Sequence, residues 1–244
     1  MLGMTTTVDL SGSPVPGISR GLTGHLARPS GDGPWPGVVV LFEAFGVEPV
    51  GLRQVERLAA AGYLALMPDL YSQGGARRCL VSTFRALSSG QGRAYQDIEA
   101  ARQWLVDSPD STGRVATVGF CMGGGFALMT ANRGFDAAAV NYGQLPSDLD
   151  AALTGACPIV GSYGGSDRSL KGAAAALEQG LERAGVPHDV KEYPNASHSF
   201  LNDAEVGPRL LRPLIRIAGM GPEPASAADA WQRIEAFLGE HLQR

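Results

Sequence analysis

The sequence contains few cysteines and no recognisable metal-binding spacing. Its 244 residues include only Cys79, Cys121 and Cys157, with neither a CxxC pair nor the spacing of a zinc finger. An odd number of isolated cysteines argues against a disulfide framework and suggests no zinc site. We therefore expect a protein of a reducing, cytoplasmic setting that holds no metal ion.

Positive charge in excess and long apolar runs are also lacking. Twenty Lys and Arg residues face 24 Asp and Glu residues, which gives a formal net charge of −4. Such a chain lacks the excess of positive charge that would attract nucleic acids or anionic membranes. No run approaches the roughly 18 apolar residues needed to span a bilayer, and the N-terminal stretch lacks the pattern of a secretory signal. We expect neither secretion nor membrane insertion, and no nucleic-acid partner.

What is present is an alternation of apolar runs of strand length with longer amphipathic segments, which is typical of parallel strands joined by crossover helices. The predicted strands are 38–42, 63–70, 114–120, 136–143, 157–164 and, shorter, 188–194. The predicted helices are 50–62, 92–108, 121–132, 169–185 and 227–242, with Gly62 and Gly185 as C-terminal stops. Near-continuous apolar strands suit a sheet covered on both faces. We predict a single α/β domain over 1–244, with a mostly parallel central sheet and helices on both faces.

The stretch GFCMGG places a cysteine among glycines where a strand ends and a helix begins. It fits the pattern Gly, any residue, nucleophile, any residue, Gly, in which the nucleophile adopts a strained backbone and its neighbours must lack side chains. The helix N-terminus favours a thiolate at Cys121, and the amide of Met122 is placed to stabilise an oxyanion. The alternative is that Cys121 is simply a small buried apolar residue.

Two downstream residues complete the order nucleophile, acid, histidine. Asp167 follows a predicted strand in the loop GGSD, where it either orients an imidazole or caps the next helix, a role that Ser166 or Ser169 could also fill. His198 lies in the loop YPNASHSF. The remaining three histidines fall at positions that favour solvated or structural roles. We predict a Cys121, His198, Asp167 triad.

These motifs, in this order, resemble those of the dienelactone hydrolases (carboxymethylenebutenolidases), which are α/β-hydrolase enzymes with a cysteine nucleophile. The resemblance covers most of the chain and rests on FEAFGV, PDLY, GFCMGG, NYG, GGSD and YPNASHSF. It implies that Glu43 lies beside the resting thiol and helps to generate the thiolate, the alternative being a solvated loop carboxylate. It also implies that the Ala44 amide is the second oxyanion donor. From the same motifs, the candidate substrate-binding side chains are Tyr71, Tyr142, Phe200 and Asn202.

Two positions depart from the family pattern. The characterised lactone hydrolases of the family hold a substrate carboxylate with two arginines, where this chain has Ser72 and Asn202. We therefore expect an ester or lactone less acidic than dienelactone. The segment 203–225, rich in Pro and Gly, is a predicted insertion that either forms a partial lid or packs on the surface or against a second copy.

The sequence as a whole predicts a hydrolase of small esters or lactones that forms an acyl-enzyme and needs no cofactor, as a monomer or homodimer. Two alternatives remain open at this point. One is a catalytically silent small-molecule-binding protein of the same fold, and the other is a thiol redox protein, against which the absence of a resolving cysteine at redox spacing argues.

Overall fold

An eight-stranded, mostly parallel sheet organises the chain in the computed structural model, which describes residues 5–207 and 220–243. The strand order is β1-β2-β4-β3-β5-β6-β7-β8. Their bounds are β1 Thr6–Asp9, β2 Thr23–Ala27, β3 Trp35–Leu41, β4 Leu64–Pro68, β5 Ser111–Phe120, β6 Ala137–Asn141, β7 Ile159–Gly164 and β8 His188–Tyr193. Strands β3 to β8 pair in parallel, whereas β1 and β2 pair antiparallel at one edge. The predicted fold class is confirmed.

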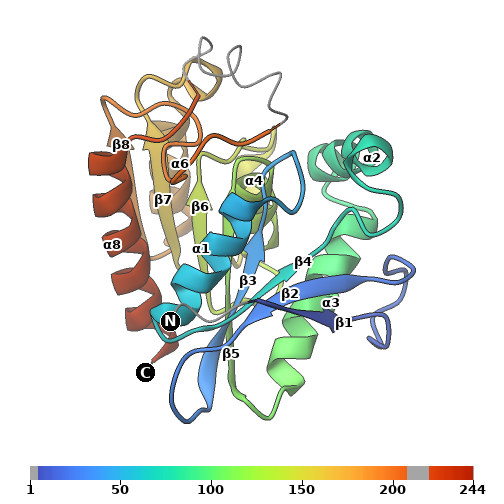
Figure 1. The fold of residues 1–244 in the computed structure, drawn as a ribbon. Helices are drawn as coiled ribbons and strands as arrows, with labels where there is room; N and C mark the ends of the chain where they lie inside the picture. Colours follow the sequence, from blue (N-terminus) through green and yellow to red (C-terminus); the bar gives the residue numbers. More distant parts are fainter. Residues whose placement is uncertain (1–4, 208–219, 244) are drawn as a thin grey trace.

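Helices cover both faces of this sheet (Figure 1). Helices α1 and α8 pack on one face, and α3, α4 and α6 pack on the other, while α2 lies beside α3 and α4. The helix bounds are α1 Pro49–Ala60, α2 Ala76–Ser89, α3 Arg93–Asp107, α4 Met122–Thr130, α5 Leu149–Leu153, α6 Ala173–Ala184 and α8 Pro224–Leu242. Because both faces are covered, the central strands β3, β4 and β6 are almost wholly buried.

Two predicted helix boundaries were wrong. The helix expected from residue 169 begins at Ala173, because Gly172 adopts a φ of 79° and separates α6 from a short 3₁₀ turn, η1 Arg168–Leu170. The last helix starts at Pro224 rather than at 227, with Glu223 accepting hydrogen bonds from the first amides of the helix. Helix α2 and strand β1 had not been expected at all. The predicted stops hold, since Gly62, two residues after the end of α1, and Gly185, directly after α6, both have positive φ.

The predicted insertion 203–225 is described only at its ends, because 208–219 lie outside the described residues. Gly221 donates a backbone hydrogen bond to the carbonyl oxygen of His198, and Glu223 donates one to that of Phe200. On the other side, the Gly207 amide donates to the Glu48 carboxylate at 2.9 Å. The described ends of the segment are thus attached to the loop that carries His198 and to the start of α1.

Candidate active site

Cys121 occupies a strained turn between β5 and α4. Its φ is 55° and its ψ is −115°, a conformation that non-glycine residues rarely adopt. The Cys121 amide donates to the carbonyl oxygen of Asn141 on β6, and its carbonyl oxygen accepts from the amide of Gly125 in α4. The strain is therefore held from both the neighbouring strand and the helix, at the carboxyl edge of the sheet where open α/β folds bind ligands.

Glycines around this turn allow the strand and the helix to meet. A Cβ atom on Gly119 would lie 1.9 Å from the carbonyl oxygen of Gly123, and one on Gly123 would lie 2.1 Å from that of Leu41. Neither contact can be relieved without moving backbone. The GxCxG motif is thus explained by steric exclusion on both sides of Cys121.

His198 and Asp167 meet across two loops that follow β8 and β7. The Nδ1 atom of His198 lies 2.6 Å from Oδ2 of Asp167, and both side chains are buried. The other carboxylate oxygen, Oδ1, accepts from the Ser169 amide at 2.9 Å and from the Ser169 hydroxyl at 2.6 Å. One carboxylate oxygen of Asp167 therefore caps the 3₁₀ turn, while the other contacts the imidazole of His198.

Electrostatics in this pair favour charge on both groups. Burial alone would lower the pKa of His198, but hydrogen bonds with Asp167 and Cys121 and the charges of both raise it to about 10. Burial pushes the pKa of Asp167 upward, yet hydrogen bonds from His198 and Ser169 bring it below its usual value. At neutral pH, these directions describe a protonated His198 between the carboxylate of Asp167 and the side chain of Cys121.

A pocket of about 220 Å³ brings Cys121 and His198 to one surface. Its remaining lining residues are Phe84, Leu87, Met122, Tyr142, Gln144, Ser169 and Leu170. Five of these, from α2, the 3₁₀ turn and the loop after β6, had not been predicted from the sequence. The helical period of α2 could have revealed Phe84 and Leu87, whereas nothing in the sequence ties Gln144 to the site.

Glu43 follows β3 and is buried rather than solvated, with 9% of its surface exposed. The alternative of a solvated loop carboxylate is therefore wrong. Burial raises its pKa, against the opposing effects of His198 and of a hydrogen bond from Asn202. The Nδ2 atom of Asn202 donates to Oε1 of Glu43 at 3.1 Å. The side chains of Ser199 and Tyr142 also face Glu43 and oppose this rise in its pKa.

The two predicted oxyanion donors lie at the start of α4 and in the loop after β3. Met122 is the first residue of α4, where backbone amides have no partner within the helix. The Ala44 amide donates no hydrogen bond to any described residue, while its carbonyl oxygen accepts from the Tyr71 hydroxyl at 2.9 Å. Tyr71 thus contacts the loop that carries Ala44.

Of the four candidate substrate-binding side chains, only Tyr142 lines the pocket around Cys121. Tyr71 and Asn202 are buried behind it, in contact with Ala44 and Glu43 respectively. Phe200 is fully buried and packs its ring against those of Tyr142 and Tyr193. The structure places these three as packing and hydrogen-bonding residues outside the pocket lining.

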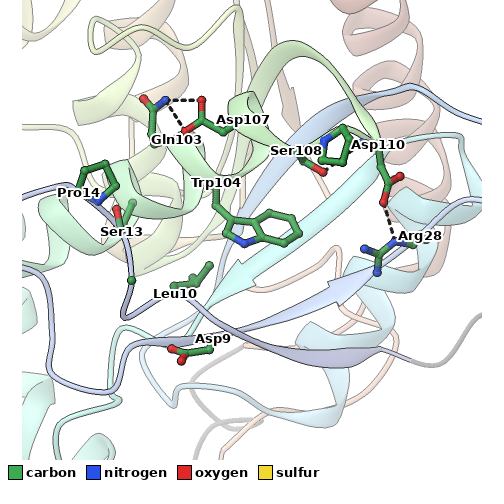
Figure 2. A pocket seen from close by; sticks show the side chains of 13 residues that line it. Asp9, Leu10, Ser13, Pro14, Arg28, Gln103, Trp104, Asp107, Ser108 and Asp110 are labelled. Carbon is green, nitrogen blue, oxygen red and sulfur yellow. Dashed lines mark hydrogen bonds and ion pairs between the residues drawn. The ribbon is translucent and has the colours of Figure 1, made fainter.

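A larger cavity of about 500 Å³ lies elsewhere, between the N-terminal strand region and the end of α3 (Figure 2). Trp104 stands in it, flanked by an Arg28–Asp110 ion pair and by a Gln103 amide that donates to Asp107. None of the predicted site residues lines it. Within the described ranges, no three His, Cys, Asp or Glu side chains are grouped as metal ligands, and no helix is long and apolar enough to cross a bilayer.

Comparison with known proteins finds relatives that match most of the chain. Residues 22–242 match the model of the dienelactone hydrolase family. The carboxymethylenebutenolidase of Rhodococcus opacus is 29% identical over 238 residues, which cover 89% of this chain and 85% of that protein.

Solved structures show the same fold. The dienelactone hydrolase of Anabaena variabilis has a TM-score of 0.71 at 21% identity, covering 99% of this chain and 100% of that one. A dienelactone hydrolase-like promiscuous phosphotriesterase from metagenomic libraries has a TM-score of 0.78 at 23% identity, covering 98% and 99%. With the family model matching nearly its whole length, the chain belongs to the dienelactone hydrolase family.

Proposed function

We propose that this enzyme hydrolyses a small, largely uncharged ester or lactone with Cys121 as nucleophile, His198 as acid and base, and Asp167 as the residue that orients His198. The observation that carries the proposal is the 2.6 Å contact between His198 and Asp167, beside a cysteine held in a strained turn in the same pocket. A buried apolar cysteine would need neither the strained backbone nor an imidazole and a buried carboxylate beside it.

In the first half of the reaction, the Cys121 thiolate, whose proton rests on His198, attacks the carbonyl carbon of the substrate and a carbon–sulfur bond forms. The amides of Met122 and Ala44 donate to the oxyanion that develops. As the carbon–oxygen bond to the leaving group breaks, the His198 imidazolium gives its proton to that oxygen. A thioester on Cys121 and an alcohol result; for a lactone, the alcohol stays attached to the acyl group.

In the second half, neutral His198 takes a proton from water, and the hydroxide formed attacks the thioester carbon. The carbon–sulfur bond breaks, the carboxylic acid leaves, and the thiolate and imidazolium are restored. Asp167 accepts from Nδ1 throughout, which fixes the tautomer and stabilises the imidazolium. Glu43, buried near His198, helps to keep the proton of Cys121 on His198 and so maintains the thiolate that attacks.

The lining of the pocket supports an uncharged substrate. Apolar side chains from α2 and the 3₁₀ turn surround the thiol, and no Lys or Arg is among the described lining residues. Asn202, which stands where the family pattern has an arginine, is engaged with Glu43. Ser72, at the other such position, donates its hydroxyl hydrogen bond to the carbonyl oxygen of Asp69. A substrate carboxylate would therefore lose hydration without gaining a lysine or arginine partner.

Comparison of three cysteine variants tests the proposal. Cys121→Ala should abolish turnover of an activated ester, whereas Cys79→Ala and Cys157→Ala should retain it, since neither of those thiols lines the pocket. An equal loss of turnover in all three folded variants would overturn the assignment. Full retention of turnover in Cys121→Ala would also overturn it.

A further inference from the structure

A chain of three buried side chains runs from α1 to Glu43, the buried carboxylate near His198. Nε2 of Gln54 donates to Oδ1 of Asn202 at 2.9 Å, and Nδ2 of Asn202 donates to Oε1 of Glu43 at 3.1 Å. All three side chains are at most 9% exposed. Gln54 does not line the pocket around Cys121, so any effect it has on the reaction must pass through Asn202.

The direction of these hydrogen bonds follows from the chemistry of the amide group. The side chain of Asn202 offers one oxygen that accepts and one nitrogen that donates, and its two ends face different partners. While Gln54 presents an N–H group to the oxygen, the nitrogen is turned toward Glu43. If Gln54 presented an acceptor instead, the Asn202 nitrogen would turn to it and its oxygen would face Glu43. A carboxylate is stabilised by the first arrangement and repelled by the second.

We propose that Gln54 is a positioning residue that sets the orientation of the Asn202 amide and thereby keeps Glu43 ionised and aimed at the catalytic centre. The inference rests on the role proposed above for Glu43. It assigns to a residue of α1, outside the pocket, control over the protonation of an acid inside the site.

Few other groups can take over this role. The groups that face Glu43 besides Asn202 are His198, Tyr142 and Ser199. Burial raises the pKa of Glu43, so the hydrogen bond from Asn202 is one of the few influences that oppose protonation. No Lys or Arg appears among the influences on its pKa.

On its outer side, Gln54 faces a second pocket, of about 310 Å³, that also contains Arg53 and Arg57. Both arginines are engaged, Arg53 with Asp203 and Arg57 with Glu235. Arg53 lies on the same helix and in the same pocket as Gln54, but it makes no hydrogen bond to Asn202. It therefore provides a matched control.

The test compares Gln54→Met, Gln54→Glu and Arg53→Met by pre-steady-state acylation with an activated neutral ester over a range of pH. Gln54→Met keeps the volume and loses the donor, and should slow acylation roughly tenfold with little change in KM, as expected for a lost hydrogen bond to a charged group. Gln54→Glu should be slower still, because it turns the Asn202 oxygen toward Glu43. In this variant the pKa of Glu43 should rise, and the acid limb of the acylation rate plotted against pH should move to higher pH. Arg53→Met should leave rate and profile unchanged.

A double-mutant cycle with Glu43→Gln gives the second readout. In that background, neither Gln54 variant should slow acylation further. The inference is overturned if both Gln54 variants acylate like the wild type, if Gln54→Glu leaves the acid limb in place, or if the effects of Gln54→Met and Glu43→Gln multiply. A loss of the proposed function looks different, since wild type would then form no adduct on Cys121 at any pH.

Discussion

The hydroxyl of Tyr71 donates a 2.9 Å hydrogen bond to the carbonyl oxygen of Ala44, linking the segment after β4 to the loop after β3. The Tyr71 ring also packs closely against Gly46, where an added Cβ would lie 2.8 Å from the ring. It packs edge-on against Phe42, with the two ring centroids 5.1 Å apart. These contacts fix the backbone around Ala44, whose amide is proposed to stabilise the oxyanion. We therefore expect Tyr71 to contribute to the reaction by fixing the backbone rather than by binding substrate.

Removing that hydroxyl should lower kcat and leave KM nearly unchanged. We expect Tyr71→Phe to reduce kcat about tenfold, because the ring packing survives while one hydrogen bond to the Ala44 carbonyl is lost. Steady-state kinetics on a neutral ester measures both constants. A rise in KM at constant kcat would instead indicate that Tyr71 contacts the substrate.

The elevated pKa of His198 should depend on the thiol. Removing Cys121 takes away a hydrogen bond and a negative charge that raise this pKa to about 10, so it should fall in Cys121→Ala. Titration of the imidazole signals by NMR measures the change, with His198→Gln identifying the resonance among the four histidines. An unchanged pKa in Cys121→Ala would show that the two side chains are not coupled.

The same pKa has a consequence for stability. The pKa of His198 in the folded protein lies above its ordinary value of 6.5. Protonated His198 therefore contributes to the free energy of unfolding, and this contribution is fully present below pH 6.5 and is lost as pH rises through about 10. Urea unfolding across this range should show a steeper decline for wild type than for His198→Gln.

The glycine before the nucleophile should tolerate no side chain. Gly119→Ala places a Cβ 1.9 Å from a backbone oxygen, and should cost more than about 3 kcal/mol of unfolding free energy or prevent folding. Gly12→Ala is the control, since nothing lies within 4 Å of its added Cβ and the change should stay within about 0.5 kcal/mol. Equal unfolding free energies for the two variants would contradict the steric account of the motif.

Charge selectivity should be reversible by adding a cation to the pocket. Leu170 lines the pocket from the 3₁₀ turn and is only partly buried, so Leu170→Arg can project a guanidinium toward the substrate. It should raise kcat/KM for a carboxylate-bearing ester relative to its neutral analogue by roughly tenfold. Leu170→Met is the control of similar length without charge. If wild type already prefers the carboxylate-bearing ester, the proposed substrate class is wrong.

The fold was largely predictable because its central strands are nearly continuous apolar runs and the elbow glycines mark where β5 gives way to α4. What escaped prediction depends on tertiary contacts. The short edge strand β1, with mostly exposed residues, carries no apolar pattern of its own. Helix α2 has only three buried residues among fourteen, and its packing beside α3 and α4 is what brings Phe84 and Leu87 to the pocket.

The site shows the same division. Motif order sufficed to nominate Cys121, Asp167 and His198, and the structure brings Asp167 and His198 into contact. The link between Gln54 and Asn202 joins residues 148 positions apart. No local pattern announces such a pairing, and only the packing of α1 against the loop after His198 creates it.

The central claim is that Cys121 carries the acyl group, and intact-protein mass spectrometry after rapid acid quenching tests it most directly. Brief mixing with a panel of activated neutral esters and unsaturated lactones should give a mass increase equal to one acyl group, mapped by peptide analysis to Cys121 and decaying at the rate of turnover. Turnover with the adduct on another residue, or neither adduct nor turnover across the whole panel, would contradict the account.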